Sequence, residues 1–296
     1  MIITHYDADG KTCLVLAKKY MNGIGSYRIC DYSNVDEVVN DYLDAIENWQ
    51  CTDSVLVITD ITISRETAER IENLKHLFNF IMLIDHHPAN HYYLKKYEWC
   101  LLFKDNTSAS KELYQYLKQK GLINMNDDSY DELINSVNSL ETWDYDNENA
   151  KIINDLSYNL KTHDFLARFL INPSLTLSKK EKIILGMRQD DIQATIQKVK
   201  PIIKGKTCYI FVDRYVTEIT EHIFGNFDNV DVLIAINPMN HSISYRSRDA
   251  RNDVSKVASE NGGDGRKTTS GSPISEDAML KIVDILLKDG AKDYAK

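Results

Sequence analysis

The chain begins with MIITHYDADGKTCLVLAKKY, which spans residues 1–20. Residues 1–6 predict a strand, and residues 11–20 carry apolar positions with helical spacing. A polar segment that ends in glycine lies between them. A strand, a turn and a helix in this order are typical of α/β folds. The end of the strand and the turn together carry one histidine and two aspartates, which indicates a function beyond connecting the two elements.

The same alternation continues along the first half of the chain. Strands are predicted at residues 27–32, 54–59 and 80–84, and helices at residues 35–49, 64–77 and 108–121. The runs SVLVIT and FIMLI are apolar along their whole length, which is typical of parallel strands that are covered on both faces. We therefore expect a doubly wound, mainly parallel sheet with helices on both faces.

The second half of the chain predicts a smaller α/β domain. After mainly helical residues 130–200, strand signals return at residues 208–212, 232–236 and 242–246, with helices at 216–224 and 275–288. A length of 296 residues suits two domains. The highly charged helix of residues 178–200 has too few apolar positions for a core. We expect an N-terminal domain of residues 1–172, a helical connector of residues 173–204 and a C-terminal domain of residues 205–296.

Composition excludes several classes of protein. The chain has 35 Lys and Arg against 44 Asp and Glu, a net charge of −9, so bulk charge does not favour binding to long nucleic acid. Its five cysteines show no CxxC spacing, which argues against a disulfide framework and a structural zinc site. No apolar run is long enough for a membrane span, and the start does not resemble a signal peptide. We expect a cytoplasmic protein with no membrane contact.

Acidic and imidazole side chains follow three of the predicted strands. They are His5, Asp7 and Asp9 after the first strand, Asp60 after the third, and Asp85, His86 and His87 after the fourth. If residues 5–9 are extended, the first three side chains point the same way. The carboxyl ends of parallel strands share one crevice, so all three sets should converge there.

Singly, each of these groups could be a helix cap, a solvated turn or a buried histidine, but together they predict a metal site. Mixed imidazole and carboxylate ligands suit Mn²⁺, Fe²⁺ or Zn²⁺ better than Mg²⁺ or Ca²⁺. The number of groups is sufficient for two ions that share a bridging carboxylate, an arrangement that serves phosphoryl hydrolysis.

The motifs HYDADG, ITD and DHHP, in this order and on these strands, resemble the DHH phosphoesterase superfamily. That family includes RecJ-type exonucleases, nanoRNases, cyclic-dinucleotide phosphodiesterases and family II pyrophosphatases. It also has a fourth aspartate motif, for which LETWD at residues 140–144 is the best match and makes Asp144 the candidate. Asp146 is a weaker alternative. The Trp-Asp pair is most similar to the nanoRNase and cyclic-nucleotide phosphodiesterase branch.

The resemblance implies a role for each residue of the predicted site. One ion would be held by His5, Asp7 and Asp60, and the second by Asp9, Asp60, His86 and Asp144. Asp60 would bridge the two ions. Asp85 and His87 would be catalytic, with Asp85 orienting a histidine and His87 facing the substrate phosphate. Mn²⁺ is the expected metal.

A glycine-rich segment near the C-terminus resembles the substrate-binding signature of the family's companion domain. Cations gather near it, and glycines let backbone N–H groups approach an anion closely. The residues expected to bind substrate are Arg246, Arg248, Gly262, Gly263, Gly265, Arg266 and Lys267. Two positions depart from the family pattern, because Asp264 stands where glycine is usual and Arg266 where histidine is usual. A flexible polar loop with a solvated basic face is the alternative interpretation.

These observations predict a two-metal phosphodiesterase that hydrolyses short oligonucleotides to nucleoside 5′-monophosphates. A cyclic mono- or dinucleotide phosphodiesterase is the first alternative, because the same site could open a cyclic diester. A non-catalytic nucleotide-binding sponge or sensor is the second, and the departures at Asp264 and Arg266 motivate it. The expected partners are short oligonucleotides or cyclic nucleotides, and a homodimer is left open.

Overall fold

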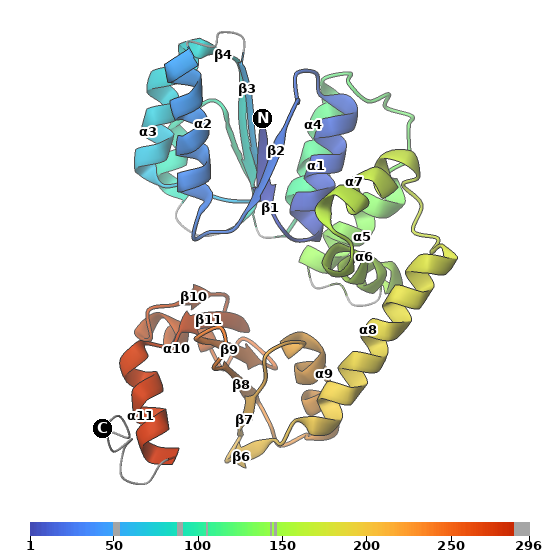
Figure 1. Ribbon diagram of the computed structural model, residues 1–296. Coiled ribbons are helices and arrows are strands. Elements are labelled where there is room, and N and C mark those ends of the chain that lie inside the picture. The colour runs from blue at the N-terminus through green and yellow to red at the C-terminus, as the bar shows by residue number, and fades with distance from the viewer. Residues whose placement is uncertain (50–53, 88–90, 105, 143, 145–146, 287–296) are drawn as a thin grey trace, which may run out of the picture. The chain divides into compact units, whose positions relative to one another are not determined.

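The computed structural model describes residues 1–49, 54–87, 91–104, 106–142, 144 and 147–286. The chain divides into two compact units, Met1–Leu185 and Gly186–Lys296. The division falls within helix α8 (Lys179–Lys198), inside the segment that the sequence assigns to a connector. Each unit has its own sheet (Figure 1). No helix among the described residues is long and apolar enough for a membrane crossing.

The N-terminal unit is built on a five-stranded sheet in which all neighbouring strands pair in parallel. The strand order is β2-β1-β3-β4-β5, and the strands are β1 (Ile2–His5), β2 (Tyr27–Cys30), β3 (Ser54–Thr59), β4 (Phe78–Asp85) and β5 (Cys100–Leu102). Strand β2 lies on one side of β1, whereas β3, β4 and β5 lie on the other side, so the strand order reverses between β1 and β3. In open α/β sheets, ligands bind outside the carboxyl ends of the strands at such a switch point.

Helices cover both faces of this sheet, as the sequence predicts. Their bounds are α1 (Ala8–Tyr20), α2 (Val35–Trp49), α3 (Arg65–Leu74), α4 (Ala109–Gln119), α5 (Asp131–Glu141), α6 (Glu148–Asn159) and α7 (Thr162–Ile171), with 3-10 turns η1 (Lys75–Leu77) and η2 (His91–Lys96). Helices α2 and α3 lie on one face, where they pack with sheet residues such as Ile3 and Ile58. Helices α1 and α4–α7 contribute to the core on the other face. The predicted fold class is therefore confirmed.

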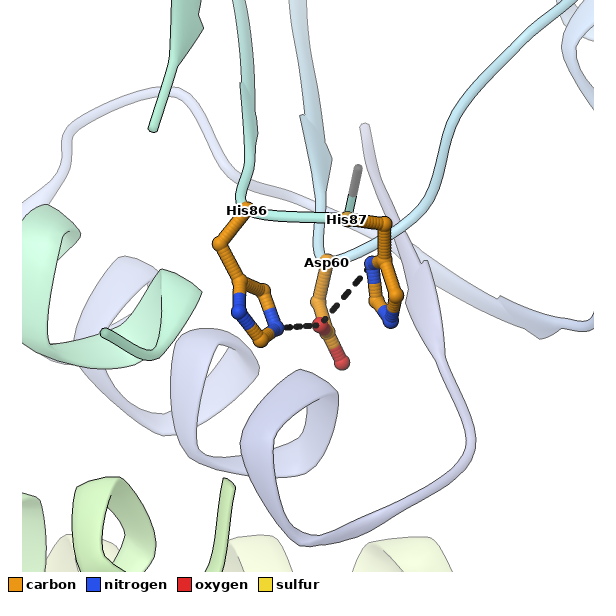
Figure 2. Close-up of side chains that lie close together, drawn as sticks. All are labelled: Asp60, His86 and His87. Atoms are coloured by element: carbon orange, nitrogen blue, oxygen red, sulfur yellow. Dashed lines mark ion pairs between the residues drawn. The ribbon is translucent and has the colours of Figure 1, made fainter. Parts of the chain in front are cut away.

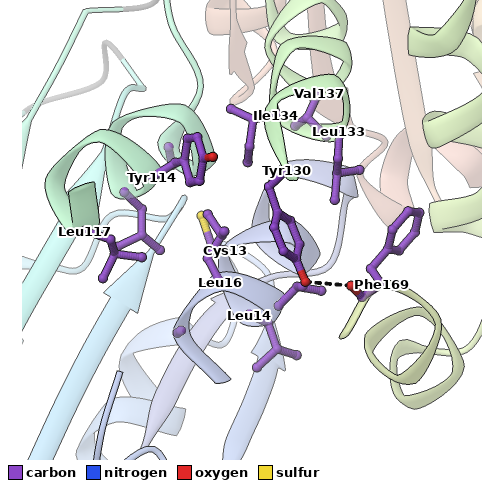
Figure 3. Packing of buried hydrophobic residues seen from close by; sticks show 14 of the residues in the cluster. Cys13, Leu14, Leu16, Tyr114, Leu117, Tyr130, Leu133, Ile134, Val137 and Phe169 are labelled. Carbon is purple, nitrogen blue, oxygen red and sulfur yellow. Dashed lines mark hydrogen bonds between the residues drawn. The ribbon is translucent and has the colours of Figure 1, made fainter. Parts of the chain in front are cut away.

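Helix α1 lies at the centre of the larger core. Ten consecutive residues from Ala8 to Ala17 are buried, because the sheet and the helices α4–α7 surround it. Figure 3 shows Tyr130, the residue directly before α5, within this core, where its hydroxyl donates a hydrogen bond of 2.8 Å to the carbonyl of Phe169. A helix that is fixed in this way holds the residues at its N-terminus firmly against the carboxyl end of β1.

The expectation that residues 5–9 are extended is wrong. Strand β1 ends at His5, and α1 begins at Ala8 with Asp7 as its N-cap, whose carboxylate accepts a hydrogen bond from the Gly10 amide at 3.0 Å. Aspartate is a strong N-cap, so the helix begins three residues earlier than predicted. Gly10 permits this turn, since a Cβ there would lie 2.3 Å from the His5 carbonyl oxygen.

The C-terminal unit contains a mixed six-stranded sheet in the order β10-β11-β9-β8-β7-β6. The strands are β6 (Ile202–Lys204), β7 (Thr207–Phe211), β8 (Val232–Asn237), β9 (Ser242–Ser247), β10 (Asp264–Gly265) and β11 (Thr269–Pro273). The helices that follow α8 are α9 (Val216–Asn226), α10 (Val254–Glu260) and α11 (Glu276–Leu286). Strands β7 and β8 pair in parallel, and the other neighbouring strands of this sheet pair in an antiparallel manner. This unit is the smaller α/β domain that the sequence predicts.

Candidate metal centre

The ends of β1, β3 and β4 bring histidines and carboxylates together around Asp60. The His5 Nδ1 atom lies 3.7 Å from the Asp60 Oδ2 atom, and the His86 Nε2 atom lies 3.3 Å from Asp60 Oδ1. Figure 2 shows His86 and His87 on opposite sides of the Asp60 carboxylate. The strand ends therefore converge as the parallel sheet predicts.

Asp60 has the surroundings of a carboxylate that binds a positive charge. Its side chain is 0% exposed, and among the described residues no hydrogen-bond donor meets either carboxylate oxygen. A buried carboxylate without donors is costly unless a charge or a metal compensates it. The backbone of Asp60 is in the left-handed region, with φ of 59°, which non-glycine residues adopt at a cost. Both features fit a divalent cation at this carboxylate.

Among the residues that the structure describes, two groups of side chains have ligand atoms close enough to hold a cation. One group is His5, Asp7 and Asp60, and the other is Asp60, His86 and His87. Within each group the ligand atoms lie within 4.8 Å of one another. Asp60 belongs to both groups, which is the position that a bridging carboxylate would occupy.

The titration behaviour of the carboxylates reflects their crowding. Burial raises the pKa of Asp60 well above its ordinary value, and the charges of Asp7 and Asp9 raise it further. Burial likewise raises the pKa of Asp9, with partial compensation from His86. Desolvation acts to raise the pKa of Asp7, but the hydrogen bond and charge of His5 outweigh it and the net pKa is lowered. Bound cations would relieve the repulsion among these three groups.

Asp9 joins the site to helix α4. Its Oδ2 and Oδ1 atoms accept hydrogen bonds from the backbone amides of Ala109 and Ser110, at 2.7 and 2.8 Å. These amides are at the N-terminus of α4, where backbone donors lack partners within the helix. Asp9 Oδ2 also lies 3.6 Å from His86 Nε2, although Asp9 is not in either three-residue group. Asp9 thus fixes the position of α4 beside the predicted metal ligands.

Asp85 holds the two histidines that follow it. One of its oxygens, Oδ1, accepts from the His86 amide at 2.9 Å and lies 2.8 Å from His87 Nδ1. Thr62 donates to the other oxygen at 2.5 Å. Although burial acts to lower the pKa of His87, the hydrogen bond and charge of Asp85 raise it overall. Since the same nitrogen lies 3.9 Å from Asp60, a metal bond at that atom would compete with the bond to Asp85.

The aspartate of the fourth predicted motif is outside the two groups of candidate ligands. Asp144 is exposed, its amide donates to the Ser139 carbonyl at 2.9 Å, and its Oδ2 atom accepts from the Ser139 hydroxyl at 3.3 Å. Asp144 is not in either group of candidate ligands, so its role as a ligand stays a prediction. The alternative Asp146, together with Trp143, lies outside the described residues.

Three residues near the centre were not identified from the sequence. Glu141, the last residue of α5, places its Oε2 atom 3.9 Å from His86 Nε2. Thr62 supports Asp85, and Tyr32 has its ring centroid 5.6 Å from those of both His5 and His87. An acidic residue within the LETWD motif was a signal for Glu141, whereas Thr62 and Tyr32 carry no signal without the fold.

In the C-terminal unit, Arg248 has a structural role that the sequence did not reveal. Its guanidinium donates to the carbonyls of Phe224, Phe227 and Val230 at 2.6, 2.9 and 2.7 Å. Carbonyls at a helix C-terminus need such donors, and a cation there is favourable. These bonds tie β9 to the end of α9, so binding of substrate phosphate would compete with them.

The glycines of the predicted substrate loop are explained by close packing. The amides of Gly262 and Gly263 donate to the carbonyls of Ser259 and Ala258 at the end of α10. A Cβ at Gly263 would lie 1.9 Å from the Gly271 carbonyl oxygen, and one at Gly265 would lie 2.4 Å from the Ser270 Cα. Only glycine at these two positions lets the loop pass so close to β11. This requirement is independent of whether the loop binds an anion.

The remaining cations of this region lie on or beside β9 and β11. Arg246 is half-buried and donates to the Tyr245 carbonyl at 3.1 Å. Arg266 is half-buried and Lys267 is exposed. Arg251, which is near these residues in the sequence, is paired with Asp249 at 2.6 Å. Substrate binding by Arg246, Arg266 and Lys267 stays a prediction.

We expect Arg248→Ala to lower the stability of the C-terminal unit by about 1–2 kcal/mol, since partly exposed hydrogen bonds from a charged donor are lost. Urea unfolding monitored by circular dichroism measures this loss. Arg248→Lys should recover only part of it, because an ammonium group cannot reproduce the spread of three donors. Unchanged stability with weakened nucleotide binding would instead show that Arg248 serves the substrate.

Comparison with known proteins gives consistent results. A family model described as "DHH family, N-terminal domain" matches residues 1–157. The chain is 24% identical over 299 residues to the oligoribonuclease NrnB of Bacillus subtilis (strain 168), a match that covers 95% of this chain and 74% of that protein. It is 22% identical over 248 residues to a 3′,5′-cyclic-nucleotide phosphodiesterase of Helicobacter pylori (strain ATCC 700392 / 26695), with 71% of each chain covered.

Solved structures share the fold. The pGpG-specific phosphodiesterase PggH from Vibrio cholerae aligns with a TM-score of 0.55 at 12% identity, over 97% of both chains. RecJ from Thermus thermophilus, solved in complex with Mn²⁺, aligns with a TM-score of 0.55 at 15% identity. That alignment covers 93% of this chain and 49% of RecJ.

Proposed function

Because this chain belongs to the DHH family, we propose that it is a metal-dependent phosphodiesterase that hydrolyses short oligonucleotides to nucleoside 5′-monophosphates. The observation that carries this proposal is the Asp60 carboxylate, which is buried between His5 and His86 and receives no hydrogen bond from the part of the chain that the structure describes. A carboxylate in this state is suited to a cation and is poorly suited to a purely structural role.

We propose that two divalent cations bind here and share Asp60. His5 and Asp7 complete one ligand set, and Asp9, His86 and Asp144 complete the other. The mixture of imidazole and carboxylate ligands suits Mn²⁺, Fe²⁺ or Zn²⁺, and of these we propose Mn²⁺. Cations bound in this way would lower the pKa of a water molecule to near 7 and offset charge on the phosphoryl oxygens.

The protein groups around these ligands have separate tasks in the proposed reaction. Asp85 fixes the ring of His87 through Nδ1, at 2.8 Å, which leaves Nε2 to face away from Asp85. From there His87 donates a hydrogen bond to the substrate phosphate and offsets the negative charge that builds in the transition state. Asp9 holds α4 in place through Ala109 and Ser110, so that the ligand set is preorganised.

The proposed substrates follow from the relatives and from charge. NrnB is named as an oligoribonuclease, and this chain covers 74% of it. A net charge of −9 disfavours long nucleic acid, which would meet repulsion beyond the site. We assign the catalytic role to residues 1–172 and substrate binding to residues 205–296, with Arg246, Arg266 and Lys267 as its cations.

A cyclic-nucleotide phosphodiesterase is the second candidate, because one relative of similar coverage is named as a 3′,5′-cyclic-nucleotide phosphodiesterase. Both reactions use a phosphodiester and a water molecule, so the metal site alone does not distinguish them.

The experiment that tests the proposal is a substrate panel. Purified protein with Mn²⁺ is incubated with 5′-labelled oligoribonucleotides of graded length, cyclic dinucleotides and 3′,5′-cyclic mononucleotides. We expect fast release of mononucleotides from the shortest oligonucleotides, a rate that falls with length, and complete loss of activity with EDTA. Preference for a cyclic substrate would replace the first candidate with the second. Tight binding of a nucleotide without turnover under any metal would contradict both.

A further inference from the structure

Tyr32 is exposed beside the candidate metal centre. It follows β2, whose Cys30 pairs with His5 of β1, so Tyr32 and Asp7 each lie two residues beyond paired strand ends. Tyr32 is 53% exposed, so a ligand can reach its ring. Its position places an accessible aromatic ring at the same sheet edge as the ligands.

The ring of Tyr32 contacts both groups of candidate ligands. Its centroid lies 5.6 Å from that of His5, tilted at 51°, and 5.6 Å from that of His87, nearly edge-on at 86°. His5 belongs to one three-residue group and His87 to the other. A molecule whose phosphate lies at Asp60 would therefore bring the atoms next to that phosphate within reach of this ring.

The turn that carries Tyr32 is built to hold it in place. The Asp31 carboxylate accepts from the Ser33 amide at 2.8 Å, and Asn34 Oδ1 accepts from the Asp31 amide at 3.0 Å. The Val35 amide donates to the Asp31 carbonyl at 3.0 Å, which starts helix α2. These hydrogen bonds fix the backbone of the turn on both sides of Tyr32, so ordering of the turn costs little when a ligand packs against the ring.

We propose that Tyr32 is a specificity-determining residue, whose ring stacks on the base of the nucleotide that has its phosphate at the metal centre. The inference rests on the proposed function for the identity of the ligand. Neutral aromatic rings next to a cluster of carboxylates suit a planar, uncharged nucleobase better than a second phosphate. Base–aromatic stacking is tolerant of sequence, so this contact favours nucleotides over other phosphate esters without selecting one base.

The test compares adenosine 5′-monophosphate with ribose 5-phosphate, which lacks the base. Affinity for each is measured by calorimetry on the Mn²⁺-loaded full chain. We expect wild type to bind adenosine 5′-monophosphate about tenfold more tightly than ribose 5-phosphate. Tyr32→Ala should bring the two affinities together, and Tyr32→Phe should keep them apart. Trp49→Ala is the matched control, since Trp49 is an 80% exposed aromatic at the far end of α2.

Three outcomes would overturn the proposal. In the first, wild type binds both ligands with equal affinity. In the second, the ratio of the two affinities in Tyr32→Ala is the same as in wild type. In the third, Tyr32→Ala loses the same amount of affinity for both ligands. The last result would mean that Tyr32 supports the histidines and does not contact the base. Neither ligand is a phosphodiester, so a failure of turnover in the substrate panel would refute the proposed function and leave this measurement intact.

Discussion

Asp60→Asn is expected to lower kcat for a dinucleotide by about a thousandfold or more, because the charge that holds the cations beside the phosphate is lost. Asn has nearly the same shape as Asp and keeps one oxygen, so the fold around β3 should persist. The measurement is a steady-state rate with Mn²⁺ in excess, together with circular dichroism of the variant.

Asp44→Asn is the matched control for this substitution. Asp44 lies on α2 in the same unit, and its carboxylate is 58% exposed and paired with Arg70. Removing an exposed charge of this kind should leave turnover near the wild-type rate. If Asp60→Asn retained Mn²⁺-dependent turnover, the assignment of Asp60 as the shared ligand would be wrong.

The second large effect concerns stability without metal. Burial raises the pKa of Asp60 above the value of about 3.8 that the group has in an unfolded chain, so the folded state binds its proton more tightly. The stability that the protonated Asp60 carboxyl contributes is therefore fully present below pH 3.8. It is lost as the pH rises through the pKa that the group has in the folded state. Asp60 therefore contributes a loss of stability to the cation-free protein as the pH rises above 3.8.

Divalent cations should reverse this loss, since they bind the deprotonated ligands of the folded state. At a concentration of one hundred times Kd, each site adds about 2.7 kcal/mol, which corresponds to a rise in Tm of roughly 5–10 °C for a unit of this size. Thermal unfolding between pH 5 and pH 8, with EDTA or Mn²⁺, measures the effect. In Asp60→Asn the pH-dependent decline should be smaller than in wild type. If the stability of the variant declined with pH as much as that of wild type, the decline would be due to other titratable groups.

Much of the N-terminal fold follows from hydrophobic periodicity. The helix predicted at residues 35–49 has those bounds in the structure, and Ser64 and Ser108 cap α3 and α4 by accepting from the Thr67 and Lys111 amides. The strand SVLVIT was recognisable because a parallel strand covered on both faces is apolar throughout.

The elements that the sequence did not predict lack such a pattern. Strand β11 has the sequence TSGSP and pairs with β9 through backbone hydrogen bonds, so its side chains give little strand signal. Strand β5 is three residues long, and α10 is a seven-residue helix directly before the glycine-rich segment. These elements are stabilised by tertiary contacts, and local propensity is a weak guide to them.

His5, Asp60 and His86 could be picked out as candidate site residues from the sequence, because each is a histidine or an aspartate at the end of a predicted strand. The start of α1 was predicted wrongly because the capping strength of Asp7 outweighed the extended pattern of the motif. Glu141 and Thr62 could not be assigned to the site, since only the packing of α5 and the chain after β3 brings them beside His86 and Asp85. The sequence had indicated Arg248 as a phosphate ligand, whereas its hydrogen bonds at the end of α9 depend on the tertiary fold.

The most direct test of the central claim is anomalous scattering from crystals of the full chain grown with Mn²⁺. We expect two anomalous peaks at the carboxyl ends of β1, β3 and β4, roughly 3.5–4 Å apart, with the Asp60 carboxylate bonded to both. A single peak, or two peaks that Asp60 does not share, would contradict the bridging role on which the proposed reaction depends.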